Sequence, residues 1–193
     1  WGLRNCTWPG DTFVRPVAPS NWGDQGNTCW SGTELCFASF LLYEGLVDEA
    51  MAIIRHVDER YRREGLYFDH QEFGGHYFRP MGAWAIVNAM LGLTVRAGRL
   101  TFAPRLPGKN QRLFFAVPHA TGHYTRKTTG ARTTLSVAIA TGALCCHELV
   151  FALDATPTKA VVTAPCDCAH DIADGVLVVR FAAPVTLTDG QSV

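Results

Sequence analysis

The stretch SGTELCFASFLLYE, residues 31–44, is the most informative part of this sequence, because it is apolar on nearly every face after Glu34. A helix at a protein surface buries one stripe, whereas a helix that is apolar all round indicates a position among other helices. Gly45 follows directly, where a left-handed glycine commonly ends a helix. We therefore predict a buried helix over residues 31–44.

Two further helical segments follow. Residues 47–63 place apolar side chains at helical spacing opposite a charged face, which predicts an amphipathic helix. Residues 80–96 begin with Pro80, a favoured first-turn residue, and are again apolar almost all round. Buried, half-exposed and buried helices in succession are typical of concentric layers in a helical toroid, whereas a plain bundle would make all three amphipathic. Three helices cannot close such a ring, so we expect the others to come from elsewhere.

The pattern changes near Gly98, after which short segments rich in β-branched and aromatic residues predict strands. These segments cover residues 99–103, 111–117, 132–140, 148–153, 159–164 and 175–181. Turn signals separate them at Pro107-Gly108, Thr129-Gly130, Thr141-Gly142, Asp174-Gly175 and Asp189-Gly190. Strands of this length and spacing are typical of an antiparallel sandwich. The predicted fold is α+β and multidomain, with the terminal helices of a helical toroid in residues 1–98 and an antiparallel β-sandwich in residues 99–193.

The charge composition limits the possible partners. Seventeen Lys and Arg balance seventeen Asp and Glu, a net charge of zero that disfavours a nucleic-acid footprint or a polybasic membrane anchor. No apolar run reaches the roughly 20 residues of a membrane-spanning helix. Only 18% of the residues are charged, against about 25% in ordinary domains. We therefore expect part of the surface to be covered by more protein, and a chain that begins at Trp1 without Met fits a piece of a longer one.

The cysteines favour a reducing compartment such as the cytoplasm over a disulfide framework. Their number, seven, is odd, and Cys145 and Cys146 are adjacent.

The segment YFDHQEFGGHYFR, residues 67–79, is the densest cluster of polar and aromatic side chains. Carboxylates and Arg make charge-assisted hydrogen bonds to sugar hydroxyls, and aromatic faces cover the apolar side of a sugar ring. His70, Glu72, His76, Tyr77 and Arg79 are therefore candidate sugar-binding residues. The structural alternative is that Arg79 pairs with Asp69 or Glu72 to hold the loop, with both histidines simply at the surface.

Trp30 and Glu34 form a second, earlier candidate set for the same site. Glu34 is either a sugar-facing carboxylate or a first-turn acid that complements the helix dipole.

Metal binding is the competing chemical interpretation. His70, Glu72 and His76 offer two imidazoles and a carboxylate, but their spacing matches no motif with a known mechanism. The run Cys166-Asp167-Cys168-Ala169-His170 lacks the two-residue gap of structural zinc sites. We predict no metal and no other cofactor.

Several segments together resemble glycoside hydrolase family 116, which contains bacterial and archaeal β-glucosidases and the non-lysosomal glucosylceramidases. The matching segments are NTCWSGTE (27–34), YEGLVDEA (43–50), RYR (60–62), EFGGHYFR (72–79) before Trp84, and LTFAP (100–104). The resemblance covers about residues 20–118, roughly half the chain, in the family's order and spacing. Residues 119–193 carry no matching motif.

The resemblance implies an (α/α)6 toroid with β-sandwich material and a retaining cleavage of β-linked sugars by two carboxylates about 5 Å apart. Both carboxylates lie upstream of this region in the family, so it implies no catalytic residue here and an inactive fragment. The partners would be a carbohydrate substrate and either the upstream part of the enzyme or a partner chain. The sugar-binding residues would be Arg79, Glu72, His70, His76, Tyr77, Glu34 and Trp30. The alternative function is a non-catalytic carbohydrate-binding or structural module.

Overall fold

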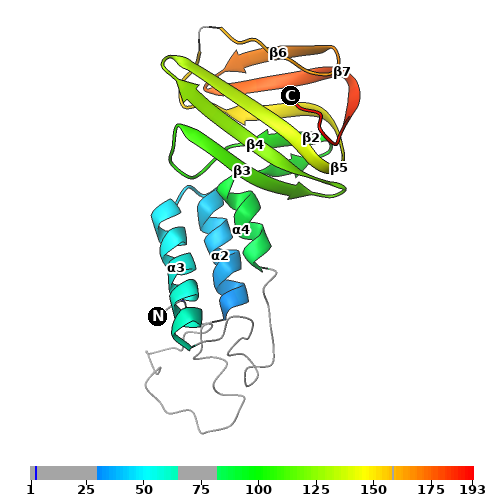
Figure 1. Ribbon diagram of the computed structural model, residues 1–193. Coiled ribbons are helices and arrows are strands. Elements are labelled where there is room, and N and C mark those ends of the chain that lie inside the picture. Colours follow the sequence, from blue (N-terminus) through cyan, green and yellow to red (C-terminus); the bar gives the residue numbers. More distant parts are fainter. Residues whose placement is uncertain (1–2, 4–29, 65–81, 158) are drawn as a thin grey trace. The chain divides into compact units, whose positions relative to one another are not determined.

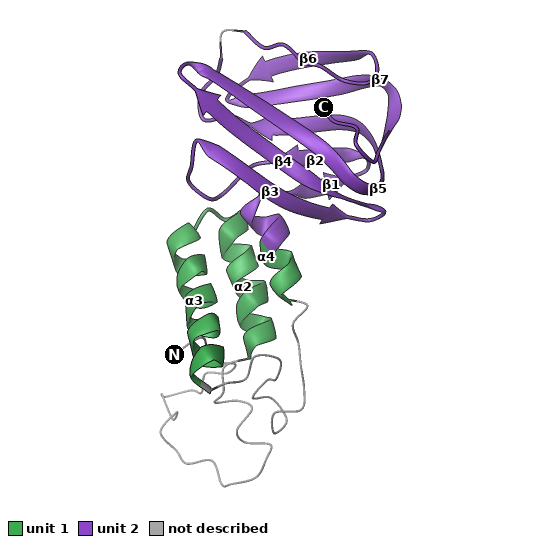
Figure 2. Cartoon of the chain, viewed as in Figure 1, with its two compact units in different colours: residues 1–86 green, residues 87–193 purple. Residues whose placement is uncertain are grey.

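The computed structural model of the chain describes residue 3 and residues 30–64, 82–157 and 159–193. These residues contain three helices and seven strands (Figure 1), which confirms the predicted α+β class. The chain divides into two compact units, residues 1–86 and 87–193 (Figure 2), which we call the helical unit and the β unit.

The helical unit is built on an antiparallel hairpin of α2 (Ser31–Tyr43) and α3 (Val47–Glu64). The predicted role of Gly45 is confirmed: it has a φ of 81°, its N–H donates to the carbonyl of Leu42, and the N–H of Leu46 donates to that of Leu41. This pair of hydrogen bonds is the Schellman ending of a helix. No helix among the described residues is long and apolar enough to cross a membrane.

Helix α4 (Gly82–Met90) is shorter than the predicted helix over residues 80–96. The prediction of its end was wrong because Gly92, at a φ of 59°, terminates the helix with the same hydrogen-bond pattern as Gly45. A Cβ at Gly92 would lie 2.0 Å from the carbonyl oxygen of Ala103, so only glycine fits this turn. The chain then continues through Leu93 into strand β1 (Thr94–Arg96). Asn88 in the last turn of α4 exchanges two hydrogen bonds with the backbone of Ala116 in strand β3 (Asn110–Val117). These bonds tie the end of α4 to the β unit, so the boundary between the two units falls before Gly98.

The β unit is a curled sheet with the strand order β1-β2-β5-β4-β3, to which β7 is added along β5 and β6 along β7. The first half of β5 pairs with β4 and the second half with β2 and β7, so this 21-residue strand belongs to both parts of the sheet. The β2–β5 pair is parallel, against the prediction of an antiparallel sheet, and the other named pairs are antiparallel. The bounds are β1 Thr94–Arg96, β2 Arg99–Phe102, β3 Asn110–Val117, β4 Ala120–Thr129, β5 Arg132–Ala152, β6 Cys168–Ala173 and β7 Val176–Thr188.

Some strand predictions were wrong. Residues 132–140 and 148–153 are one strand, because the Thr141-Gly142 pair lies inside β5 instead of forming a turn. Residues 159–164 form no strand, and β4 and β6 were not predicted. The turns at Thr129-Gly130, Asp174-Gly175 and Asp189-Gly190 are confirmed.

Four aromatic rings form the centre of the β-unit core. The ring of Phe102 lies 5.7 Å from that of Phe115, 5.8 Å from that of Tyr124 and 5.6 Å from that of Phe151, between ring centroids. All four side chains are at most 3% exposed, and each comes from a different strand. Burial raises the pKa of Tyr124 to about 12, since the phenolate would have to exist away from water. The core thus joins β2, β3, β4 and β5.

Candidate functional site

Most of the predicted sugar-binding residues lie outside the described residues. His70, Glu72, His76, Tyr77 and Arg79 all belong to the segment 65–81, which connects the last residue of α3 to the first of α4. Trp30 and Glu34 are described, at the start of α2.

The ends of three helices come together where this segment is attached. Because α2 and α3 are antiparallel, the first turn of α2 lies beside the last turn of α3. Helix α4 also begins there: a Cβ at Gly82 would lie 2.9 Å from the carbonyl oxygen of Gly32. Segments 4–29 and 65–81 are therefore both covalently joined to this end of the helical unit, and the side chains at this end form the candidate site.

A buried ion pair between Glu34 and Arg60 anchors this end. The side chain of Glu34 is 1% exposed and that of Arg60 is 7% exposed. Arg60 Nη2 donates to Glu34 Oε2, and Arg60 Nη1 lies 3.4 Å from Oε1. The backbone N–H of Leu3 also donates to Oε1, over 2.8 Å. Both carboxylate oxygens of Glu34 are thus occupied by groups of the chain itself.

A hydrogen bond between two side chains lies beside the ion pair. Ser31 Oγ is 2.9 Å from the hydroxyl oxygen of Tyr61, and it joins the same two helix ends. We call Ser31, Glu34, Arg60 and Tyr61 the clasp. Its members come in pairs from residues 31–34 and 60–61, which are nearly 30 positions apart in the sequence. The clasp fixes where the segments on either side of it leave the helices.

Sequence reasoning missed Arg60, although a signal for it exists. Ala50, Ile53 and Val57 are buried on one face of α3, and Arg60 continues that face three positions later. An Arg in line with an apolar stripe predicts a buried carboxylate partner, since an unpaired buried charge is very costly. Glu34, within the apolar helix α2, is the matching acid.

An open groove of about 800 Å³ runs between the three helices. Its rim includes the ion pair of Asp58 and Arg62, whose Nε lies 2.9 Å from the carboxylate. The lining is otherwise mostly aliphatic: Leu35, Ile54, Val57, Asp58, Tyr61, Arg62, Ala83 and Ile86. Such a surface suits apolar side chains from another protein segment better than sugar hydroxyls.

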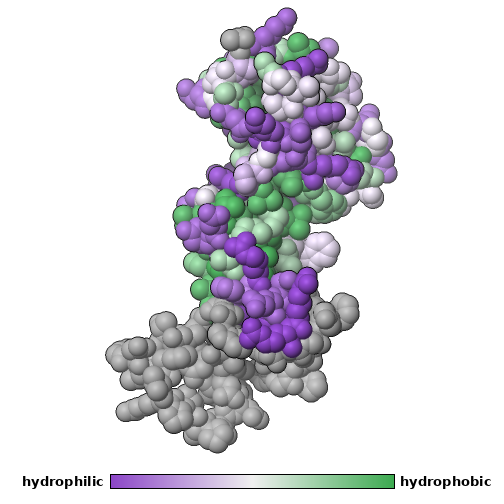
Figure 3. Space-filling view, turned by 60° about the vertical axis from the view of Figure 1, so that its left-hand side comes forward, coloured by the Kyte–Doolittle hydropathy of each residue, from purple (hydrophilic) through white to green (hydrophobic). Residues whose placement is uncertain are grey.

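Large aromatic side chains of the helical unit are exposed. Phe37 and Phe40 on α2 stack with ring centroids 6.1 Å apart and are 42% and 54% exposed, and Trp84 on α4 is 68% exposed. Apolar surface gathers over the helices in Figure 3. The expectation that α2 is covered on all sides is therefore not met by the described residues alone. Contiguous exposed apolar surface usually marks an interaction site.

No group of three potential metal ligands converges anywhere in the described parts of the chain. Cys166, Cys168 and His170, which looked ligand-rich, are in that part, whereas His70, Glu72 and His76 fall outside it. Burial, with the neighbouring thiols of Cys145 and Cys166, raises the pKa of Cys146 to about 11. A raised thiol pKa opposes the thiolate form that metals need.

The sequence matches no protein-family model, and no curated protein is significantly similar to it.

Proposed function

We propose that this chain is the C-terminal part of a glycoside hydrolase of the family 116 type, which cleaves β-linked sugars. In this proposal α2, α3 and α4 are the last helices of an (α/α)6 toroid, and the curled sheet is one part of a β-sandwich domain. The nucleophile and the acid/base are carboxylates supplied by an upstream segment or a partner chain. This chain contributes residues that hold the sugar.

The clasp is the observation that carries the proposal. Two of the segments that resemble the family, NTCWSGTE and RYR, are joined by its side chains at one end of the helical unit. Another such segment, residues 72–79, belongs to the chain connection between α3 and α4 and lies outside the described residues. The segments around Ser31–Glu34 and Arg60–Tyr61, far apart in the sequence, thus meet at this end.

The clasp also suggests separate roles for the site residues. Since its carboxylate oxygens are occupied within the protein, Glu34 holds Arg60 and the helix ends in place. Direct sugar contact falls to Arg79, Glu72, His70, His76, Tyr77 and Trp30. Arg79 and Glu72 would bind hydroxyl groups, and the aromatic residues would cover the sugar ring.

The exposed aromatic residues support the toroid. Phe37, Phe40 and Trp84 would be buried against the inner helices that the upstream part provides. The apolar groove between α2, α3 and α4 would accept side chains from those helices.

The test uses the complete polypeptide, including all residues upstream of Trp1, with an aryl β-glucoside as substrate. We expect hydrolysis with retention of configuration by the complete polypeptide and no hydrolysis by the 193-residue chain alone. The substitution Arg79→Ala should lower kcat/KM by roughly 10- to 100-fold, the value of one charge-assisted hydrogen bond of about 1.5–3 kcal/mol.

Arg55→Ala is the matched control, because Arg55 is exposed on α3 and lies outside both the groove and the segments that resemble the family. Its kcat/KM should stay unchanged. A complete polypeptide that hydrolyses no β-glycoside would contradict the proposed activity. An Arg79→Ala enzyme with an unchanged kcat/KM would contradict the assigned site.

A further inference from the structure

The zero net charge of the chain conceals a strongly basic segment. No Asp or Glu occurs between Pro104 and His147, while six Lys and Arg do: Arg105, Lys109, Arg112, Arg126, Lys127 and Arg132. The rest of the chain carries eleven Lys and Arg against all seventeen Asp and Glu. Strands β3, β4 and the first half of β5 are built entirely from this segment. A charge balance taken over the whole chain therefore says little about this part of the surface.

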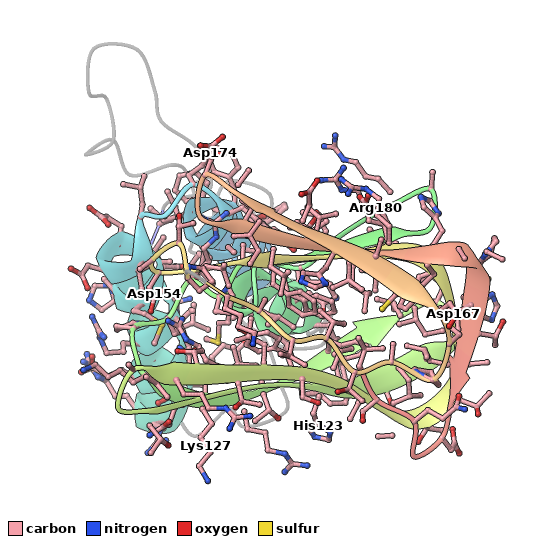
Figure 4. All side chains as sticks on the ribbon, turned by 90° about the horizontal axis from the view of Figure 1, so that it is seen from above. His123, Lys127, Asp154, Asp167, Asp174 and Arg180 are labelled. Atoms are coloured by element: carbon pink, nitrogen blue, oxygen red, sulfur yellow. The ribbon has the colours of Figure 1, made fainter. Side chains whose placement is uncertain are left out.

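Strand pairing gathers the basic residues on one face of these strands. Phe114 pairs with His123 across β3 and β4, and the neighbouring positions on the same face hold Arg112 and Lys127. Arg132 is opposite Thr129 at the turn between β4 and β5. We call Arg112, Phe114, His123, Lys127 and Arg132 the basic face. His123 and Lys127 point away from the strands in Figure 4.

The opposite face of these strands is the core, because alternate residues of a strand point to opposite sides. Phe115, Tyr124 and Val137 are completely buried there. By the same alternation, Arg126 of β4 lies on the core side of the strands, and its guanidinium pairs with Asp154. The basic face is thus separate from the hydrophobic core and from this ion pair.

The cations of the basic face have no acidic partners within the described parts of the chain. Arg112, Lys127 and Arg132 are exposed and form no ion pair there. The other part of the sheet differs: Glu148 on β5 forms ion pairs with Arg99 on β2 and Arg180 on β7, each with an N–O distance of 3.0 Å. Figure 4 shows Arg180 on the side of the unit opposite His123 and Lys127. Three unpaired cations on one face of these strands indicate a surface complementary to an anionic ligand.

The remaining side chains of this face indicate what kind of anion fits. The ring of Phe114 is 37% exposed, and His123 meets it edge-on, at 74° with centroids 5.9 Å apart. The strands therefore offer one flat aromatic ring on a face that also carries the hydroxyl groups of Thr125, Thr134 and Ser136, as the strand register shows. A single-stranded nucleic acid would use successive rings to stack successive bases. One ring, hydroxyl groups and cations suit a sugar that carries an acidic group.

We propose that the basic face binds an anionic polysaccharide. Phe114 would cover the apolar side of one sugar ring, the hydroxyl side chains would hydrogen-bond to its hydroxyl groups, and Arg112, Lys127 and Arg132 would bind the carboxylate or sulfate groups. This surface lies in the β unit and does not depend on the catalytic role proposed above.

The test measures binding of the full 193-residue chain by isothermal titration calorimetry. Polygalacturonate presents carboxylates, dextran sulfate presents sulfates, and neutral dextran presents neither. We expect binding to one or both of the anionic polymers, which identifies the acidic group, and none to neutral dextran. The variant with Arg112→Gln, Lys127→Gln and Arg132→Gln should bind at least tenfold more weakly, and Phe114→Ala should also lose affinity at unchanged charge.

The matched control variant carries Arg55→Gln, Arg96→Gln and Lys159→Gln. These three residues are exposed elsewhere, so the total charge falls by the same amount. Its affinity should stay within twofold of the unmodified chain, and thermal unfolding should show that every variant is folded. Equal loss of affinity in both triple variants would overturn the proposal, as would an unchanged affinity of Phe114→Ala. Binding to neither anionic polymer, or tighter binding to oligothymidylate or to anionic phospholipid vesicles, would also overturn it.

Discussion

The two units of this chain differ in how deeply they bury most of their aromatic side chains. The β unit packs Phe102, Phe115, Tyr124 and Phe151 together and leaves none of them more than 3% exposed. The helical unit leaves Phe37, Phe40 and Trp84 between 42% and 68% exposed. The difference indicates that the β unit completes its own core, whereas the helices present apolar surface for further protein to cover. Three predictions test this comparison.

The largest expected effect is on the β unit. Phe102→Ala removes the ring that contacts all three neighbours, and we expect it to lower the free energy of unfolding by about 4 kcal/mol, since a buried Phe→Ala change costs 3–5 kcal/mol. Phe40→Ala in the helical unit should change it by less than about 0.5 kcal/mol, as for other exposed positions. Amide hydrogen exchange along β5 and α2 measures the two effects separately. A large loss of unfolding free energy in Phe40→Ala would mean that the helical unit packs this ring within its own core.

The second effect is on the clasp. Arg60→Ala leaves Glu34 buried without its guanidinium, which should destabilise the helical unit by about 3 kcal/mol. Arg62→Ala, two positions along α3 but exposed, should cost at most about 0.5 kcal/mol. Tryptophan fluorescence during urea unfolding reports on this unit selectively, because all five tryptophans of the chain lie within residues 1–86. Similar losses in both variants would show that the helices are not held together by the buried ion pair.

The smallest effect appears only at alkaline pH. The folded β unit keeps the Tyr124 proton up to a pKa of about 12, whereas the unfolded chain loses it near 10. Between these values the unfolded state is favoured as pH rises, and the loss of stability reaches about 2–3 kcal/mol. Tyr124→Phe should abolish this loss.

At pH 8 Tyr124→Phe should be at least as stable as the unmodified chain, because the buried Tyr124 hydroxyl hydrogen-bonds to no other residue in the described part of the chain. Above pH 10 the stability advantage of the variant should widen. Parallel stability curves across pH 8–12 would contradict the proposed cause. Cys146, whose pKa is raised to about 11, contributes equally to both proteins.

The helices were predictable because each depends on local signals. Residues 31–44 and 47–63 are apolar or amphipathic over several turns, and Gly45 marks the boundary between them. The end of α4 was not predictable, because Leu91, Leu93 and Val95 continue the apolar pattern into β1. Only the close approach of Ala103 to Gly92 shows why the helix must end there, and this contact is not local.

The strands were less predictable for two physical reasons. Strand β4, ATGHYTRKTT, shows little alternation because Gly122 takes an inward position, where a Cβ would lie 2.5 Å from the ring of Phe115. Strand β5 passes through Thr141-Gly142, a typical turn signal, since it continues from one part of the sheet into the other. The second feature depends on β2 and β7, which are distant in the sequence from the first half of β5.

The candidate site was predictable only as a set of residue types. Glu34 was identified as a possible sugar ligand or a dipole partner, and the structure instead gives it a buried arginine 26 positions away. The outward side of β3 and β4 was missed entirely, because the whole-chain charge of zero was taken as representative of every surface. Counting charges segment by segment would have distinguished the basic residues 104–147 from the rest of the chain.

Strand β5 also has a consequence for the order in which the β unit folds. Turns of a few residues join β3, β4 and the first half of β5, so these strands can pair soon after they leave the ribosome. Leu100 of β2 must wait for Leu149, and the far edge of β5 stays bare until Val176–Thr188 of β7 has been synthesised. A long strand edge whose backbone N–H and C=O groups are unpaired can pair with strands of other chains. We expect nascent chains that stall before β7 to be the species most prone to aggregation.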